Sequence, residues 1–304
     1  MGRRRVTDTT DFYAIETGDE IEVGGRLYRV TGNEKERRFG MEDPKFWVKR
    51  AEDVESGDRK IIKLSYFESF GTTLGGVKIQ CFRNPKKEAD IVESMKDHPH
   101  FMHGVSHSDE KGNSIRVLDI VHGRNFFAHI QSLYMNHEDY FYREFPDILE
   151  KLITAFTAIG DLHARGFKHG DIRNDHIIIE RSTGRYVWID FDYDYETTEN
   201  PFSLDLFGLG NILLSAAGKG IHSLYDIRHM DGYGDLVDRL EPGDFSILEK
   251  WRFCNLQKLY PYIPDNLNRI LMHFSRDATI YYDHVDEMIE DMTDSLETAK
   301  QQRS

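Results

Sequence analysis

The hydrophobic pattern of this chain of 304 residues changes its period near residue 145. Before that point, apolar residues form short β-rich runs separated by turn residues, which predicts an antiparallel meander. From Phe145 to Gly166 they recur at three- and four-residue steps, the spacing of one long amphipathic helix that ends at a glycine. A strand-rich part followed by a helical part predicts an α+β chain, built as one two-lobed domain or as two modest ones.

The remaining elements follow from the same patterns. The predicted strands are residues 21–23, 26–30, 46–49, 60–66, 101–106 and 114–121. Residues 71–76 are predicted to form a loop, and Asn84-Pro85 opens a predicted helix over residues 85–96. After the long helix, residues 177–179 and 187–189 bracket a turn and predict a small hairpin. Helical periodicity dominates the rest of the chain.

Charge and composition argue against several classes of function. The chain has 53 acidic and 39 basic side chains, so its net charge of −14 disfavours general nucleic-acid binding. No apolar run approaches the roughly 20 residues that cross a bilayer, and no apolar signal core follows Met1. Cys81 and Cys254 are far apart, so neither a disulfide framework nor a zinc ribbon is expected. We therefore expect a cytoplasmic protein without a membrane or nucleic-acid partner.

Three segments carry motifs in a distinctive order. Lys63 ends an apolar strand, His169-Gly170-Asp171 follows the long helix, and Ile189-Asp190-Phe191-Asp192 follows the hairpin. This arrangement resembles the protein-kinase-like superfamily over nearly the whole chain. The His-Gly-Asp triplet resembles the catalytic loop of aminoglycoside, choline and lipopolysaccharide kinases and of some bacterial protein kinases. Residues 263–267 and the helices after them resemble the tail of bacterial serine/threonine kinases.

The resemblance implies a two-lobed fold with a nucleotide and a divalent cation in the cleft between the lobes. Residues 1–118 would form a small antiparallel β-rich lobe with one main helix, residues 119–122 a hinge, and residues 123–304 a larger helical lobe. The implied reaction is ATP-dependent transfer of the terminal phosphoryl group to a hydroxyl, in which catalysis is mainly positioning and charge neutralisation. The acceptor, a protein serine or threonine or a small molecule, is not identified by the sequence.

The resemblance also implies which residues contact the nucleotide. Lys63 would contact the phosphates, with Glu88 as its partner and Glu93 on the same helix as the alternative. The backbone between Asp119 and Val121 would hydrogen-bond the adenine edge. The nucleotide-binding residues are therefore implied to come from the N-terminal lobe (Lys63 and Glu88) and from the hinge (Asp119 and Val121).

The residues implied to act on the reacting groups lie further along the chain. Asp171 would accept or orient the acceptor hydroxyl, a task that needs a carboxylate beside the attacking oxygen. Asp190 would bind Mg²⁺ or Mn²⁺. Where the superfamily has a second metal-binding Asn, this chain has His176, whose imidazole is a better ligand for Mn²⁺ than for Mg²⁺. Asn174 or Asp175 could substitute for it after a small loop shift.

The chain departs from the superfamily pattern at two further places. In residues 30–46 only Gly32 and Gly40 occur, so no GxGxxG phosphate loop is recognisable. Asp205, expected to brace the catalytic loop, comes only 15 residues after Asp190, and no Ala-Pro-Glu occurs. That leaves little chain for an activation loop and a peptide platform.

These departures leave two alternatives to a protein kinase. The short segment and the His-Gly-Asp triplet favour a small-molecule kinase for a sugar or an antibiotic-like acceptor. His176 and the missing glycine-rich loop favour a pseudokinase that acts as a nucleotide-binding signalling scaffold. Asp192 and Asp194 are interpreted either as additional carboxylates near the metal or as a solvated acidic loop.

Overall fold

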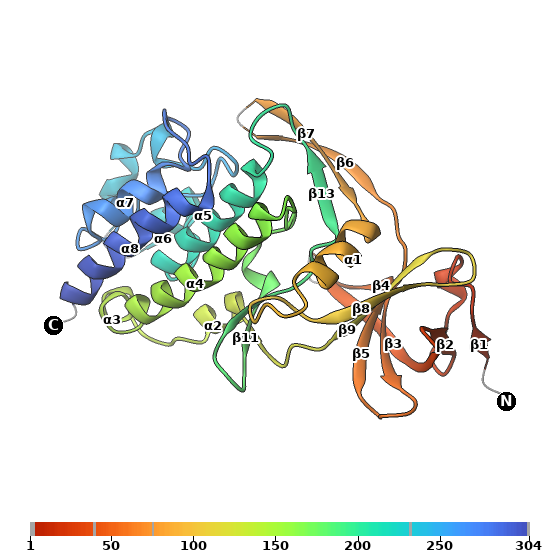
Figure 1. Ribbon diagram of the computed structural model, residues 1–304. Helices are drawn as coiled ribbons and strands as arrows, with labels where there is room; N and C mark the ends of the chain where they lie inside the picture. The colour runs from red at the N-terminus through yellow and green to blue at the C-terminus, as the bar shows by residue number, and fades with distance from the viewer. Residues whose placement is uncertain (1–3, 39–40, 75, 231–232, 303–304) are drawn as a thin grey trace. The chain divides into compact units, whose positions relative to one another are not determined.

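The computed structural model describes residues 4–38, 41–74, 76–230 and 233–302 (Figure 1). Its fold is mixed α+β, which confirms the predicted fold class at that level. The chain divides into two compact units. Unit 1 consists of Met1–Ser69, Phe82–His122 and Phe191–Asp194, and unit 2 consists of Phe70–Cys81, Gly123–Asp190 and Tyr195–Ser304.

Unit 1 is built on a curled seven-stranded sheet with the strand order β1-β2-β3-β4-β5-β9-β8. β1 and β2 are parallel, and the other neighbours are antiparallel. Buried apolar side chains, among them Ile21, Val30 and Ile62, form its core. The strands are β1 Arg5–Val6, β2 Glu20–Val23, β3 Arg26–Arg38, β4 Met41–Asp53, β5 Arg59–Lys63, β8 Gly104–Ser108 and β9 Ser114–Asp119.

The strands β3 and β4 are longer than the sequence predicted. Each has 13 residues, whereas the apolar runs covered only residues 26–30 and 46–49. The additional polar residues, such as Glu34 and Lys45, pair across one long hairpin with two register shifts. Their side chains carry no hydrophobic period, so backbone pairing rather than burial extends the strands. Gly40, one of the two glycines considered for a phosphate loop, lies outside the described residues.

The helix α1 (Pro85–Ser94) begins where the Asn84-Pro85 pair predicted it. The Asn84 side chain accepts a hydrogen bond from the backbone N–H of Lys87, and Pro85 lies in the first turn, where its missing N–H is not needed. The buried face of α1 contains Ile91 and Val92 and also Glu88. The helix therefore brings one carboxylate into the interior of unit 1.

Unit 2 is mainly helical. Its long helix α4 (Phe145–Ala164) confirms the predicted amphipathic helix and packs against α5 (Ser203–Ala217) and α8 (Val285–Gln302) (Figure 1). The predicted hairpin is present as two strands of an antiparallel sheet with the order β10-β11-β12. The remaining elements of this sheet and unit are β10 Gly123–Asn125, β11 Ile177–Glu180, β12 Tyr186–Trp188, α2 Phe126–Gln131, α3 His137–Arg143, α6 Leu224–His229 and α7 Asp265–Met272. Short 3₁₀ turns are η1 Phe12–Ala14 in unit 1 and η2 Asn174–His176, η3 Gly234–Arg239, η4 Pro242–Asp244 and η5 Leu256–Lys258 in unit 2.

A second three-stranded sheet has the order β13-β7-β6. Its strands are β6 Ser69–Leu74, β7 Val77–Arg83 and β13 Tyr193–Glu196. The prediction of a loop over residues 71–76 was wrong for residues 71–74, which belong to β6. β6 pairs with β7, which follows it directly, and β7 pairs on its other side with β13, more than a hundred positions further along the chain. As a result, the short segment after Asp190 is held as a strand.

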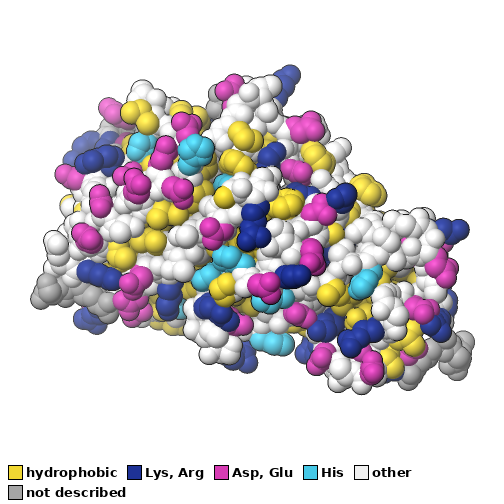
Figure 2. All heavy atoms as spheres, viewed as in Figure 1, with side chains coloured by type: hydrophobic (Ala, Val, Ile, Leu, Met, Phe, Trp, Pro, Cys, Tyr) yellow, Lys and Arg dark blue, Asp and Glu magenta, His cyan; other side chains and the backbone are white. Residues whose placement is uncertain are grey.

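Charged side chains of both signs are intermixed on the face shown in Figure 2. This distribution agrees with the acidic overall composition and shows no continuous basic area on that face. Within the described stretches, every helix is too short or too polar to cross a bilayer.

Candidate functional site

Lys63 and Glu88 lie together inside unit 1. Lys63 is the last residue of β5, and its Nζ is 2.8 Å from Oε1 of Glu88 on α1. Both side chains are buried, and Glu88 is 0% exposed. An ammonium group and a carboxylate removed from water in this way stabilise the fold only as a pair, because each would otherwise be a buried unpaired charge. The partner that the sequence assigned to Lys63 is therefore its partner in the structure, and the alternative, Glu93, pairs with Lys96 on the surface.

Glu88 has a second cationic partner that the sequence analysis missed. Arg116 on β9 places its Nε 3.0 Å from Glu88 Oε2 and is itself buried. Its other guanidinium nitrogens donate to the carbonyl oxygens of Ser114 and Leu64. A signal was available, because an arginine within the apolar run from Ile115 to Leu118 is costly unless it is paired.

Asp192 also belongs to this group, and the interpretation of it as a solvated acidic residue was wrong. It is 3% exposed, with Oδ2 at 2.5 Å from Arg83 and 3.7 Å from Lys63 Nζ. Arg83 in turn bonds Glu68 and lies over the ring of Tyr193, 4.1 Å from its centroid. We refer to Lys63, Arg83, Glu88, Arg116 and Asp192 as the buried ion-pair network. Its members come from β5, β7, α1, β9 and the stretch just before β13.

The positions assigned to adenine recognition lie at and after the end of β9. The carboxylate of Asp119 is half exposed and pairs with Lys60 at 2.6 Å, while its backbone N–H donates to the carbonyl of His103. Val121 follows in a stretch without regular structure. Among the described residues, no backbone hydrogen bond involves Val121. The assignment of Asp119 and Val121 to adenine recognition stays a prediction.

The loop that carries Asp171 is held by a carboxylate from α5. Asp205 accepts hydrogen bonds from the backbone N–H groups of His169 at 2.7 Å and Gly170 at 2.9 Å, and from His163 at 2.9 Å. Burial raises the pKa of Asp205, but the bond and charge of His163, the charge of His169 and the Gly170 N–H outweigh it, so the pKa is lowered overall. The predicted bracing role of Asp205 is confirmed.

Local backbone geometry explains two residues of the His-Gly-Asp triplet. Gly170 has φ +84°, a left-handed conformation that costs glycine little and other residues more. His169 is fully buried against Trp188, with the ring centroids 5.3 Å apart at 71°. These contacts fit the predicted structural role of His169 and leave Asp171 as the accessible member of the triplet, 21% exposed in its side chain.

His176 lies between the two candidate catalytic carboxylates of unit 2. Its Nδ1 is 2.8 Å from the carbonyl oxygen of Asp171 and 3.5 Å from the Asp171 carboxylate, and its Nε2 is 3.6 Å from Asp190 Oδ2. Because a carbonyl oxygen only accepts, Nδ1 carries a proton, and in the neutral ring Nε2 holds the lone pair. The structure thus brings Asp171, His176 and Asp190 together and directs the basic nitrogen of the ring toward Asp190.

Asp190 has a strained backbone. Its φ of +65° is a left-handed value that non-glycine residues adopt rarely and that is concentrated at functional sites. A cation bound at Asp190 and His176 would have one oxygen and one nitrogen ligand from this unit, a set that suits Mn²⁺ better than Mg²⁺. In the described part of the chain, no three His, Cys, Asp or Glu side chains gather into a complete metal site. The other ligands would have to be phosphate oxygens and water, as is usual for these cations.

The two residues considered as substitutes for His176 are placed differently. Asp175 forms a two-point ion pair with Arg173, at 2.6 and 3.0 Å. Its pKa is lowered, because this bond and the charges of His176 and Arg173 outweigh the effect of burial. Asn174 begins the turn η2, and its buried Oδ1 has no hydrogen-bond partner in the described structure. Of the three, His176 is the residue whose contacts reach both carboxylates.

No protein-family model matches the chain. An alignment 190 residues long, which covers 53% of this chain and 37% of the other protein, shows 25% identity to the mouse (Mus musculus) protein "Sperm motility kinase Tcr mutant form". This distant and partial similarity supports a kinase-like relationship. It spans too little of either chain to identify an activity, an acceptor or a cofactor.

Proposed function

We propose that this protein is an atypical phosphotransferase of the protein-kinase-like type, which transfers the terminal phosphoryl group of ATP to a hydroxyl. In this proposal, Lys63 contacts the nucleotide phosphates, and the backbone from Asp119 to Val121 contacts the adenine. Asp171 orients the acceptor hydroxyl, and Asp190 with His176 holds Mg²⁺ or Mn²⁺. The cation would neutralise phosphate charge when it is bound.

The observation that carries the proposal is the buried pair of Lys63 and Glu88, 2.8 Å apart. A lysine at the end of an edge-exposed strand would need no such partner, whereas a lysine that must present its ammonium group to phosphate needs a fixed position. An independent feature of unit 2 supports the same proposal. There the Asp205 carboxylate accepts hydrogen bonds from the backbone N–H groups of His169 and Gly170. Both features coincide with positions that the motif order assigned.

The decisive experiment measures nucleotide binding and ADP release with Mg²⁺ and with Mn²⁺. Wild-type protein should show a higher melting temperature with ATP and metal, since a ligand that binds the folded state stabilises it. Lys63→Met should weaken that shift. Lys86→Met is a matched control, because Lys86 is 81% exposed on α1 and pairs only with Asp90 across one helical turn.

Folding of the Lys63 variant must be checked, because its removal takes one of two cations away from each of the buried carboxylates Glu88 and Asp192. Lys63→Arg retains the charge and alters only its shape, so it separates loss of phosphate contact from loss of structure. The proposal fails if wild-type protein shows neither a thermal shift nor ADP release at millimolar ATP with either metal.

A small-molecule acceptor is the alternative within the same chemistry. The segment from Asp190 to Asp205 is short, and part of it is fixed as β13 beside β7. That arrangement favours an acceptor that does not need an extended peptide platform. Labelled ATP presented with protein, sugar and antibiotic-like acceptors separates the two, because the label then appears on only one class.

A nucleotide-binding scaffold is the alternative from another class. The observation that favours it is His176, whose Nδ1 is already engaged by the Asp171 backbone, at the position of a metal-binding Asn. Binding of ATP without any ADP release in either metal, in protein that is folded and saturated, would select this alternative.

A further inference from the structure

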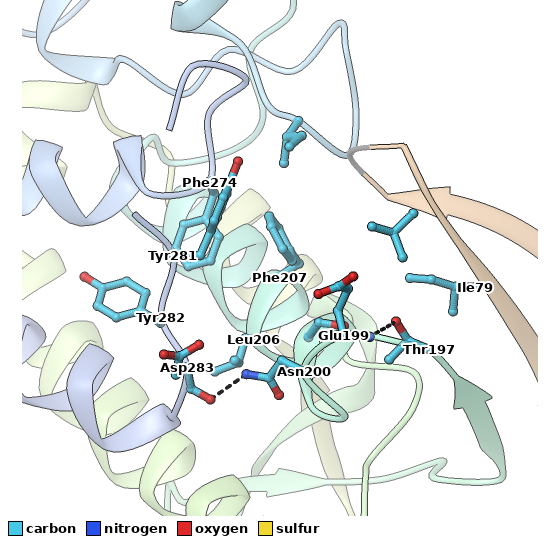
Figure 3. A pocket seen from close by; sticks show the side chains of 13 residues that line it. Ile79, Thr197, Glu199, Asn200, Leu206, Phe207, Phe274, Tyr281, Tyr282 and Asp283 are labelled. Carbon is cyan, nitrogen blue, oxygen red and sulfur yellow. Dashed lines mark hydrogen bonds between the residues drawn. The ribbon is translucent and has the colours of Figure 1, made fainter. Parts of the chain in front are cut away.

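We propose that a pocket in unit 2, separate from all the residues discussed above, binds a small organic cation with an apolar or aromatic body. The pocket has a volume of about 340 Å³ and lies between β7, the segment after β13, α5 and the stretch before α8 (Figure 3). This volume is within the range of small-molecule sites. None of its lining residues belongs to the buried ion-pair network or to the loop of Asp171, so the inference does not rest on the proposed function.

The walls of the pocket are largely apolar and aromatic. The rings of Phe207 and Phe274 are 5.6 Å apart at 76°, and those of Phe207 and Tyr281 are 6.0 Å apart at 50°. Figure 3 shows these three side chains on one side of the pocket and Ile79 on the other. Rings tilted against one another present π faces in more than one direction, and such faces attract cations within about 6 Å of the ring centroid.

The charges at the pocket are all of one sign. Thirteen residues line it, and the ionisable acids among them are Glu199 and Asp283, with no Lys, Arg or His in that described lining. The carboxylates of Glu199 and Asp283 make no hydrogen bond or ion pair to other described side chains. The side-chain amide of Asn200, in the same wall, donates a hydrogen bond to the backbone carbonyl oxygen of Asp283 at 2.7 Å (Figure 3).

Charge complementarity therefore determines the kind of occupant. An anion would face two carboxylates without a compensating cation, and a neutral apolar compound would leave both carboxylates unused. An ammonium group on an apolar body satisfies both parts of the lining, because the body covers the rings while the charge faces one of the carboxylates. A partner protein could offer the same chemistry through a lysine side chain, but the pocket is of a size for a small ligand.

The test compares two probes of nearly equal shape, 2-phenylethylamine and 2-phenylethanol, titrated into the full chain and followed by ligand-observed NMR. The amine should bind at least tenfold more tightly at low salt, and its advantage should fall at high salt as the carboxylates are screened. Glu199→Gln together with Asp283→Asn should reduce the affinity for the amine to that for the alcohol. The two single variants then show which carboxylate faces the ammonium group.

Two further variants locate the site. Tyr281→Ala should weaken both probes, because the ring of Tyr281 is 41% exposed and can be removed without opening the core. Glu297→Gln on α8 removes an exposed acid outside the pocket and should change neither affinity. The proposal is overturned by equal binding of amine and alcohol, by an amine preference that survives the double variant, by binding insensitive to Tyr281→Ala, or by no saturable binding of the amine.

Discussion

The candidate site residues of unit 1 and those of unit 2 are held in place in opposite ways. In unit 1, the buried ion-pair network excludes water and fixes each charge by an opposite charge, so that Lys63, Glu88 and Asp192 are each at most 5% exposed. In unit 2, Asp171 and Asp190 are each 21% exposed in their side chains. The loop of Asp171 is positioned through backbone hydrogen bonds from His169 and Gly170 to Asp205. The ion-pair network in unit 1 is therefore also part of the core, whereas the two carboxylates in unit 2 remain partly accessible to solvent.

This difference predicts that changes at Asp171 affect the rate and that changes in the buried ion-pair network affect stability. A buried charge that loses its partner destabilises a protein by about 3–5 kcal/mol. A carboxylate that is partly exposed, as Asp171 is, leaves no buried unpaired charge behind when it is neutralised. The following experiments test this contrast, beginning with the largest expected effect.

Asp171→Asn should give the largest effect, on the rate alone. We expect phosphoryl transfer to fall by roughly 10²–10⁴-fold, the range for loss of a positioned general base, with nucleotide affinity and melting temperature nearly unchanged. Asp139→Asn is the control elsewhere in unit 2, because Asp139 is 39% exposed and pairs with Arg143 across one turn of α3. Steady-state rates and thermal unfolding of both variants show whether the rate falls without a loss of stability. Retained turnover in Asp171→Asn would move the catalytic role to another carboxylate.

Glu88→Gln should show the reverse behaviour. It leaves Lys63 and Arg116 without the carboxylate that bridges them, so we expect a loss of about 3–5 kcal/mol in the free energy of unfolding. Urea denaturation followed by circular dichroism measures it. Glu93→Gln on the same helix, 73% exposed, should change stability by less than about 0.5 kcal/mol. Equal losses in the free energy of unfolding for Glu88→Gln and Glu93→Gln would contradict a special role of the buried ion-pair network in stability.

Asp205→Asn should have an intermediate effect on both properties. It weakens charge-assisted hydrogen bonds to the loop backbone, so we expect about 1.5–3 kcal/mol less stability and a lower rate. Because the pKa of Asp205 is lowered in the folded state, its stabilisation is complete above its unfolded pKa of about 4 and is lost as the pH falls through the lower folded value. Urea unfolding of both proteins at pH 7 and at successively lower pH should therefore give a difference that shrinks below about pH 4. A constant difference would argue against an ionised Asp205.

His176→Asn should have the smallest effect, seen in the choice of metal. The imidazole directs Nε2 toward Asp190, so the wild-type protein should be more active with Mn²⁺ than with Mg²⁺. The substitution should raise the rate with Mg²⁺ and lower the ratio of the Mn²⁺ rate to the Mg²⁺ rate by a few-fold. An unchanged ratio would mean that His176 only packs in the loop and is not a metal ligand.

The sequence was most informative where one segment contains the whole signal. The amphipathic period of α4, the Asn84-Pro85 start of α1 and the hairpin of β11 and β12 were predicted because each depends on neighbours within a few residues. The bracing of the catalytic loop by Asp205 was also predicted, through the order of the motifs. The ion pair of Lys63 and Glu88 came from the same resemblance rather than from any local pattern.

The missed ion pairs need a partner from another segment of the chain. Arg83 and Asp192 looked like ordinary charged residues in sequence, and the signal at Arg116 was its place in an apolar run, yet each is buried beside an opposite charge. The missed strand segments have local partners but no hydrophobic signal. Strand β6 lacks a clear apolar alternation, although its neighbour β7 follows it directly in the chain. The polar halves of β3 and β4 pair with each other across one hairpin.

The class of fold, the order of the motifs and the residue types that the proposed phosphoryl transfer would use could be predicted from the sequence, because these depend on local periodicity and on the identity of a few side chains. Only the tertiary structure decided which charges are buried and paired, that the segment after Asp190 is held as a strand, and that His176 faces both carboxylates. The physical reason is that burial and ion pairing are properties of pairs of groups. A sequence names each group, but only folding brings the members of a pair to within hydrogen-bonding distance and removes the water between them.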